Sequence, residues 1–313
     1  MEIVKEEVYS RLPNKFFYTN DKSKSILEDS KDDKLLLIMH YLYILSNYEF
    51  NCIINLEYLM KRCGYKPIKK NVDSFNKSLK YLKKKEYISY QGSDISLKEL
   101  IVIDTTNLLT MCDKGEFTLI QESELDILKN FNTNSRSLLN HAKVYFNIKA
   151  RIYKPSNNFD WYDEDGRNAI ATYMTYDRIE IESKVSRNYI KRYLNNLETF
   201  NMITIKNFQY RYGKGKYDNH YKESPNVITI NNLECFTEKK TTIDSELNLM
   251  FKEFKISKED EGYTFIKISK ELNELNMINH RKTGYLGMFV SQGKATKEQE
   301  EEYKKRKSNS ALT

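Results

Sequence analysis

The chain has 313 residues, enough for about two ordinary domains, and 40% of them are hydrophobic, so it can bury real cores. Charged residues make up 30%, and the longest uninterrupted apolar runs, such as 35–39, are far short of a membrane span. The amino-terminal segment has no apolar stretch of the kind that secretory signals carry, and the four cysteines are widely scattered. These features argue against a secreted, disulfide-bonded or membrane protein and predict a cytoplasmic one.

The formal net charge of +7 is concentrated in two windows of the chain. Window 66–92 carries +6 and window 184–222 carries +7, so the remaining residues sum to −6. Such segregation of positive charge is typical of proteins that bind polyanions, nucleic acids among them. The alternative is a pair of solvated lysine-rich faces without a ligand.

The two basic windows lie in matching sequence contexts, which indicates a repeat. With a shift of 115 residues, apolar positions of the first copy fall on apolar positions of the second: Leu79, Leu82, Ile88 and Tyr90 align with Leu194, Leu197, Ile203 and Ile205. Upstream, 56–60 align with 176–180, because the first copy has about five extra residues in a turn. A period this long indicates duplicated domains and not a solenoid.

In each copy, hydrophobic spacing and turn residues predict the same series of elements. For the first copy we expect a helix over 35–45 after Asp32 and Asp33, a strand at 52–54, a short helix from Leu56 that ends by Gly64 and Pro67, a helix over 71–85, and strands 87–90 and 100–104 around a turn at Gly92 and Ser93. For the second copy we expect a helix over 136–153, an acidic insert at 156–168, a strand at 173–174, helices 177–184 and 187–199, strand 202–207, a long hairpin, and strand 226–230. Ser186 is expected to cap the helix over 187–199.

This series of elements is that of a winged helix-turn-helix, so the sequence predicts a mostly α protein with small β wings, of the α+β class. The expected organisation is a winged-helix domain at 13–112, a second at 117–232, and a polar helical tail at 237–313 that is partly disordered. In the tail we expect an amphipathic helix over 243–254 and a short one over 272–278. The stripe of Leu247, Met250, Phe251 and Phe254 would bind a partner or dock on the second domain.

The third helix of each copy is the candidate DNA-reading element, because the later helix of a helix-turn-helix lies in the major groove. In the second copy the apolar stripe of Ile190, Leu194 and Leu197 leaves an outward face of Arg, Lys and Asn, the side chains that pair with guanine and adenine edges: Arg187, Asn188, Lys191, Arg192 and Asn195. In the first copy the expected outward face has lysine as its only cation and suits phosphates: Lys69, Lys70, Asn71, Ser74, Lys77, Lys80 and Lys84.

The hairpin of the second copy interleaves cations, rings and glycines over 210–217. Arg211, Lys214 and Lys216 would line phosphates or enter a minor groove. A solvated hairpin tip is the alternative. The Gly-Lys-Gly-Lys string lacks the spacing of a nucleotide-binding P-loop.

No catalytic residues, metal site or cofactor are predicted. The histidines His40, His141, His220 and His280 are isolated, and no cysteine or histidine cluster has the spacing of a metal site. The acidic stretch 160–165 does not match a calcium-binding EF-hand loop. We therefore expect a protein that is not an enzyme.

The segments FTLIQESELDIL, LLNHAKVYFNIKARIY and SRNYIKRYLNNLE resemble helix-turn-helix proteins carried by plasmids and phages of low-GC Gram-positive bacteria, some of which are replication initiators or replisome organisers. The segment YSRLPNKFF, followed by a winged helix, is similar to plasmid initiators of the RepA N-terminal type. The resemblance covers about residues 10–232. It implies binding to repeated origin sequences, with Arg187, Asn188, Lys191 and Arg192 as the origin-reading positions, and recruitment of host replication proteins.

The sequence thus predicts sequence-specific binding of double-stranded DNA by a plasmid or phage replication initiator. Host replication proteins recruited through the tail and a second copy of the chain in a homodimer are the protein partners considered. A winged-helix transcriptional regulator and a protein-interaction module are the two alternatives.

Overall fold

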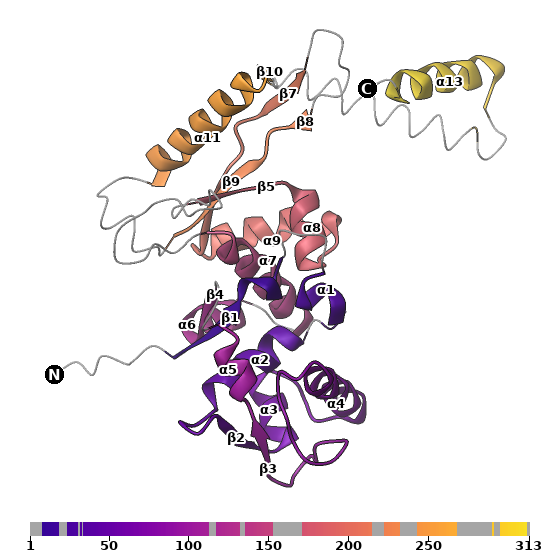
Figure 1. Cartoon of the computed structure of the whole chain (residues 1–313). Coiled ribbons are helices and arrows are strands. Elements are labelled where there is room, and N and C mark those ends of the chain that lie inside the picture. Colours follow the sequence, from indigo (N-terminus) through magenta and orange to yellow (C-terminus); the bar gives the residue numbers. More distant parts are fainter. Residues whose placement is uncertain are drawn as a thin grey trace. The chain divides into compact units, whose positions relative to one another are not determined.

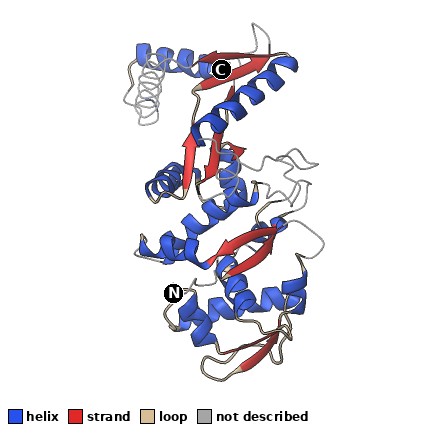
Figure 2. Cartoon of the chain, turned by 90° about the vertical axis from the view of Figure 1, so that its left-hand side faces the viewer, coloured by secondary structure: helices blue, strands red, loops and turns tan. Residues whose placement is uncertain are grey.

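The computed structural model describes residues 8–18, 24–30, 32, 34–112, 117–131, 135–152, 171–214, 222–231, 243–267, 290 and 295–311. Helices and small sheets alternate along the chain, which confirms the α+β class (Figures 1 and 2). The chain divides into two compact units. Unit 1 holds Met1–Ile205 and Ile228–Ile243, and unit 2 holds Lys206–Val227 and Asp244–Thr313.

The first repeat lies in unit 1. Its elements are α2 (Leu35–Ile44), β2 (Asn51–Ile54), α3 (Leu56–Arg62), α4 (Lys69–Lys84) and β3 (Ile101–Asp104). Strands β2 and β3 pair antiparallel, and Ser89 forms an isolated bridge to Asp104. The expected strand over 87–90 is therefore reduced to this bridge, which lies on the other side of β3 from β2.

The second repeat has the same order of elements. They are α7 (Ser135–Ala150), β5 (Ala171–Met174), α8 (Tyr176–Ser183), α9 (Arg187–Thr199), β6 (Ile203–Lys206) and β9 (Asn226–Ile230). The order across its sheet is β5-β9-β6, so the last strand lies between the other two, as in the first repeat. The expected acidic insert at 156–168 lies outside the described residues.

The turns that follow the third helices match at the offset of 115 residues. Glu86 and Asn201 both adopt the left-handed conformation, with φ of 60° and 55°. The next amide in each copy bonds back to a buried leucine carbonyl: Tyr87 N to Leu82 O and Met202 N to Leu197 O, both at 3.0 Å. Both helices therefore end in the same Schellman-type turn.

The start and end of the second helices match at the offset of 120 residues. Asn55 caps α3 by accepting from the amide of Tyr58, and Thr175 caps α8 by accepting from that of Arg178. Each helix is followed by a left-handed residue, Gly64 with φ of 78° and Lys184 with φ of 57°. The duplication inferred from sequence is thus repeated in the backbone conformation.

Elements outside the repeats, none of them predicted, connect the two copies. They are β1 (Tyr9–Pro13), the 3-10 helix η1 (Asn14–Phe16), α1 (Ile26–Ser30), α5 (Thr106–Thr110), β4 (Phe117–Gln121) and α6 (Glu122–Asn130). Strands β1 and β4 pair antiparallel; β1 packs on α2 of the first repeat and β4 on α7 of the second. One hydrophobic core then runs through both repeats and includes Leu79 and Leu194. The copies that we expected as separate domains at 13–112 and 117–232 lie together in unit 1, except for 206–227.

Unit 2 combines the hairpin of the second repeat with the tail. Its described elements are β7 (Tyr210–Lys214), β8 (Lys222–Glu223), α11 (Ile243–Asp260), β10 (Tyr263–Lys267) and α13 (Lys297–Ala311). Strand β10 pairs antiparallel with β7, so the sheet order is β10-β7-β8 (Figure 1). The division therefore places the hairpin with the tail, whereas we expected it in the second domain. The end of the tail that we expected to be partly disordered contains helix α13, and the short helix expected over 272–278 lies outside the described residues.

Aromatic rings hold α11 against this sheet. Phe251 stacks on Phe208 with ring centroids 3.9 Å apart, and Phe254 packs edge-on against Tyr212 at 5.7 Å. Leu247 and Met250 of the same stripe are also buried. The stripe that we expected to bind a partner or the second domain is covered within unit 2.

Candidate nucleic-acid interface

Helix α9 is amphipathic, and its buried side fixes which residues face solvent. Ile190, Leu194 and Leu197 are at most 1% exposed and belong to the core of unit 1. All five residues predicted to face outward are exposed: Arg187, Asn188, Lys191, Arg192 and Asn195. For Lys191 and Arg192, no ion-pair partner lies among the residues that the structure describes. This face therefore presents two uncompensated cations beside two amide side chains.

The start of α9 is held by side chains of α8. Ser186 precedes the helix, but its side chain makes no capping hydrogen bond, so the predicted serine cap is wrong. The Oε1 atom of Glu180 accepts from the amide of Arg187 at 2.9 Å instead. The Oδ1 atom of Asp177 lies 2.5 Å from Nη1 of Arg187, and both side chains are more than half exposed. Two carboxylates of α8 thus neutralise the first turn of α9, where helix amides lack internal partners.

Helix α4 is the equivalent element of the first repeat. The sequence predicts a buried stripe of Val72, Phe75, Leu79 and Leu82; the last three are buried, and Val72 is half-buried. The predicted lysines are all exposed: Lys69, Lys70, Lys77, Lys80 and Lys84. Asn71 and Ser74, expected on the outward face, are half-buried, and the Asn71 side chain donates to the carbonyl of Lys66 at 2.8 Å.

One flank of α4 is covered by the loop that follows it. The Asn76 side chain accepts from the amide of Ile95 at 2.9 Å, and Lys80 pairs with Asp94 at 2.8 Å. Lys83 donates to the carbonyl oxygens of Tyr90 at 2.6 Å and Gly92 at 2.9 Å, which a left-handed Gly92 brings within reach. These contacts recur at positions i, i+4 and i+7, so they follow one side of the helix. Part of the predicted cationic face is therefore engaged within the first repeat.

The end of α4 meets helix α1. Asp29 pairs with Lys85 at 2.8 Å and accepts from the hydroxyl of Tyr81 at 2.9 Å. The hydrogen bond from Lys85, and then that from Tyr81, lowers the pKa of the Asp29 carboxyl. The neighbouring Glu28 pairs at 3.1 Å with Lys184, which follows α8 of the second repeat. An acidic helix thus contacts basic residues of both copies.

The described hairpin cations differ in exposure. Arg211 is half-buried on β7, whereas Lys214 is exposed, with its ammonium 4.7 Å from the centre of the Tyr263 ring on β10. Lys216 lies outside the described residues. The sequence signal that was missed is the run from Tyr263 to Lys267, in which aromatic and aliphatic residues of strong β propensity follow the left-handed Gly262.

The described histidines are structural. His40 is fully buried, its Nδ1 lies 2.8 Å from the hydroxyl of Ser10, and burial lowers its pKa to about 3. His141 is buried between a carbonyl oxygen of its own helix and Asn196. Within the described ranges, no three His, Cys, Asp or Glu side chains are grouped so that they could hold a metal ion.

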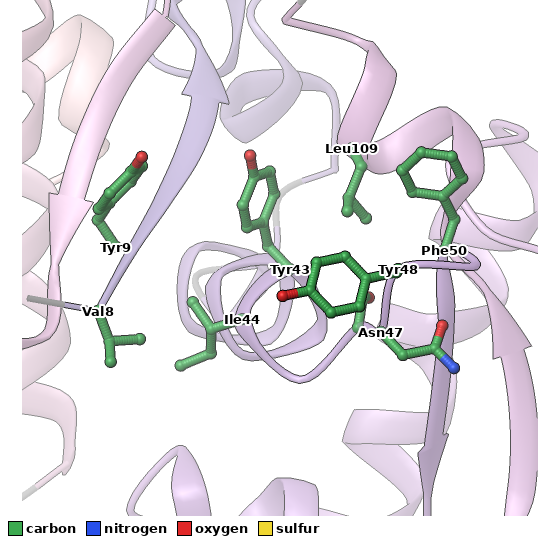
Figure 3. A pocket seen from close by; sticks show the side chains of 9 residues that line it. Val8, Tyr9, Tyr43, Ile44, Asn47, Tyr48, Phe50 and Leu109 are labelled. Carbon is green, nitrogen blue, oxygen red and sulfur yellow. The ribbon is translucent and has the colours of Figure 1, made fainter. Parts of the chain in front are cut away.

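An open hollow of about 750 Å³ lies in unit 1 where β1 begins and α2 ends (Figure 3). Its lining is aromatic, aliphatic or uncharged, with Tyr9, Tyr43, Tyr48 and Phe50 around it. Without a cation in its wall, the hollow is no candidate for a polyanion. The exposed faces of α4 and α9 remain the strongest candidates for a functional surface.

No protein-family model, curated protein or solved structure matches the chain. The described helices include none that is both long enough and apolar enough to cross a membrane.

Proposed function

We propose that the chain binds double-stranded DNA in a sequence-specific manner through two winged-helix repeats. The observation that carries this proposal is the face of α9, where arginine, lysine and asparagine side chains are exposed together on a helix that follows a short turn from α8. In such an arrangement the later helix, here α9, enters the major groove, and these residue types reach base edges and phosphates.

Two further observations support the proposal. The strand order of both sheets, with the last strand between the first and the middle one, is the order expected of winged helices. The exposed lysines of α4 add a second cationic helix to the same unit. Two cationic helices on one core provide for affinity in one copy and base selection in the other.

The test is a titration with duplex DNA selected from a random pool by the intact chain. Binding through both helices should weaken with salt, with a log–log slope of roughly −0.9 per phosphate and about six to ten phosphates in total. Replacement of Arg187 or Asn188 by Ala should cost about 1–3 kcal/mol and relax base preference. A slope near zero, or failure of the selection to enrich any sequence, would rule out the proposal.

Within this class, the resemblance to plasmid and phage proteins favours a replication initiator. The test places the coding region and its flanking DNA on a plasmid that cannot otherwise replicate. An initiator should support replication, and the Arg187→Ala variant of it should not. Repression of a neighbouring promoter without replication would identify a transcriptional regulator instead.

A further inference from the structure

Asp177 on α8 is an exposed acidic residue that contacts the first residue of the candidate face of α9. Its carboxylate contacts the guanidinium of Arg187 at 2.5 Å, and the two side chains are 59% and 58% exposed. A carboxylate that faces a DNA backbone is repelled by the phosphates, so it lowers affinity unless it performs another task. Its position therefore calls for an explanation beyond charge balance.

The geometry of the pair leaves Arg187 able to bind a base. A guanidinium has five N–H donors in a planar fork, and the short contact with Asp177 is made by Nη1. Donors remain for the O6 and N7 acceptors of a guanine, which arginine recognises through two hydrogen bonds. An arginine already held in place loses less side-chain freedom on binding than an unrestrained one.

The first repeat provides a natural comparison. At the position equivalent to Asp177, offset by 120 residues, lies Glu57, which pairs with Lys61 of its own helix at 2.7 Å. At the position equivalent to Arg187, offset by 115 residues, lies Val72. The first repeat thus carries the carboxylate without an arginine to hold, which makes Glu57 a matched control.

We propose that Asp177 is a positioning residue that orients the Arg187 guanidinium for bidentate recognition of a guanine in the major groove. This inference rests on the proposed function, since it requires that α9 reads DNA. It predicts that the loss of Asp177 weakens discrimination at one base pair. Affinity for duplexes of other sequences should stay the same or rise slightly.

The experiment uses the full chain and the selected duplex, with each guanine replaced in turn by 7-deazaguanine, which lacks the N7 acceptor. For the unsubstituted protein, one guanine should show a loss of affinity on the order of ten-fold. In Asp177→Asn this loss should shrink toward the value measured for Arg187→Ala, and the double variant should show no further change. Glu57→Gln, which removes the same charge from the first repeat, should leave the loss intact.

Several results would overturn the inference. Asp177→Asn could keep the full ten-fold loss, or it could raise affinity for all duplexes without changing that loss, in which case the carboxylate only competes with DNA. If the chain binds its selected duplex but no guanine substitution matters, Arg187 reads no guanine, and the inference fails while DNA binding stands. If the chain binds no duplex at all, the proposed function fails and the inference with it.

Discussion

The two repeats have the same order of elements but differ in the side chains that their third helices expose. Helix α4 has lysine as its only exposed cation, and its flank is engaged through Asn76, Lys80 and Lys83 with the loop that follows it. Helix α9 exposes arginine, lysine and asparagine, with Arg187 held by α8. Under the proposed function, the first copy would contribute affinity and the second copy base selection.

The repeats also reverse one ion pair. Residues 62 and 182 are equivalent at the offset of 120 and lie at the same point of the second helix. Arg62 pairs with Glu122 of α6 at 2.7 Å, and the side chains are 35% and 23% exposed. Glu182 pairs with Arg151 after α7, where the side chains are only 11% and 8% exposed. The same structural position therefore holds an anion, Glu182, where the pair is buried, and a cation, Arg62, where the pair is more exposed.

The largest expected effect comes from this reversed pair. Glu182→Ala leaves the buried Arg151 guanidinium without its carboxylate, although the guanidinium still stacks on the Tyr18 ring 3.4 Å away. Breaking a buried pair on one side costs about 3 kcal/mol of the free energy of unfolding, whereas Arg62→Ala, at the partly exposed pair, should cost about 1 kcal/mol. Chemical denaturation of both variants at neutral pH measures the difference. Equal costs would show that burial does not separate the two repeats.

The next largest effect is a dependence of stability on pH, caused by two buried histidines. His40 and His141 lie in the first helices of the two repeats. Burial lowers the pKa of His40 to about 3. An unfolded histidine binds its proton below about pH 6.5, so between these values the unfolded state holds more protons and stability falls as the pH falls. The stability that neutral His40 contributes to the folded state is complete above the pKa of the unfolded histidine and is lost as the pH falls toward 3. The expected slope is about 1.4 kcal/mol per pH unit, or about 2 kcal/mol from pH 6 to 4.5.

Asparagine variants separate the two histidines. An asparagine at position 40 keeps a polar atom near the Ser10 hydroxyl, and it removes the titration, so His40→Asn should flatten the dependence of stability on pH. Burial also lowers the pKa of His141, but its bond to the Ser137 carbonyl favours the protonated ring and opposes that shift. His141→Asn should therefore flatten the dependence less. The reverse ranking in denaturation midpoints measured from pH 7 to 4.5 would contradict this assignment.

The matched turns after the third helices predict a smaller effect, which is a gain in stability instead of a loss. Glu86→Gly relieves a left-handed conformation that costs an ordinary residue about 1 kcal/mol, so it should stabilise the chain by about 0.5 kcal/mol after the entropy of glycine is included. Asn201→Gly should not stabilise, because asparagine tolerates this conformation and the Asn201 side chain accepts from Asn231 at 2.9 Å. Thermal unfolding of the pair tests the comparison. A gain from Asn201→Gly would show that its hydrogen bond contributes nothing.

The sequence predicts those features of the fold that depend on residues close together in the chain, and not those that depend on distant ones. The helix stripes, such as Ile190, Leu194 and Leu197, were predictable because a period of 3.6 residues is local. The equivalence of α4 and α9 was predictable from aligned leucines. Strands β1 and β4 pair across more than 100 residues, and their short alternating runs were not distinguishable from loop.

The candidate site was predicted in composition but not in its contacts. The exposed residues of α9 follow from its apolar stripe alone. The Glu180 bond that replaces the Ser186 cap, and the Asp94 partner of Lys80, depend on how loops return to the helices, which no local pattern encodes. The pairing of β10 with β7, which joins the hairpin to the tail, could not be predicted for the same reason, because paired residues are at least 49 positions apart in the chain.

The smallest expected effect distinguishes two lysines of α4 that look alike in the sequence. Lys77 is exposed and has no ion-pair partner among the described side chains, whereas Lys80 is paired with Asp94 at 2.8 Å. A lysine that already neutralises a carboxylate releases less of the DNA counterion atmosphere when it meets a phosphate. Lys77→Ala should therefore lower the magnitude of the log–log salt slope by about 0.9, and Lys80→Ala by less. Asp94→Asn should steepen the slope, because it frees Lys80.

Anisotropy titrations on one unselected duplex, between roughly 50 and 200 mM salt, provide the slopes and keep base selection out of the measurement. If Lys80→Ala has the larger effect, the ion pair opens when DNA binds, and the flank of α4 covered by its own loop belongs to the interface after all.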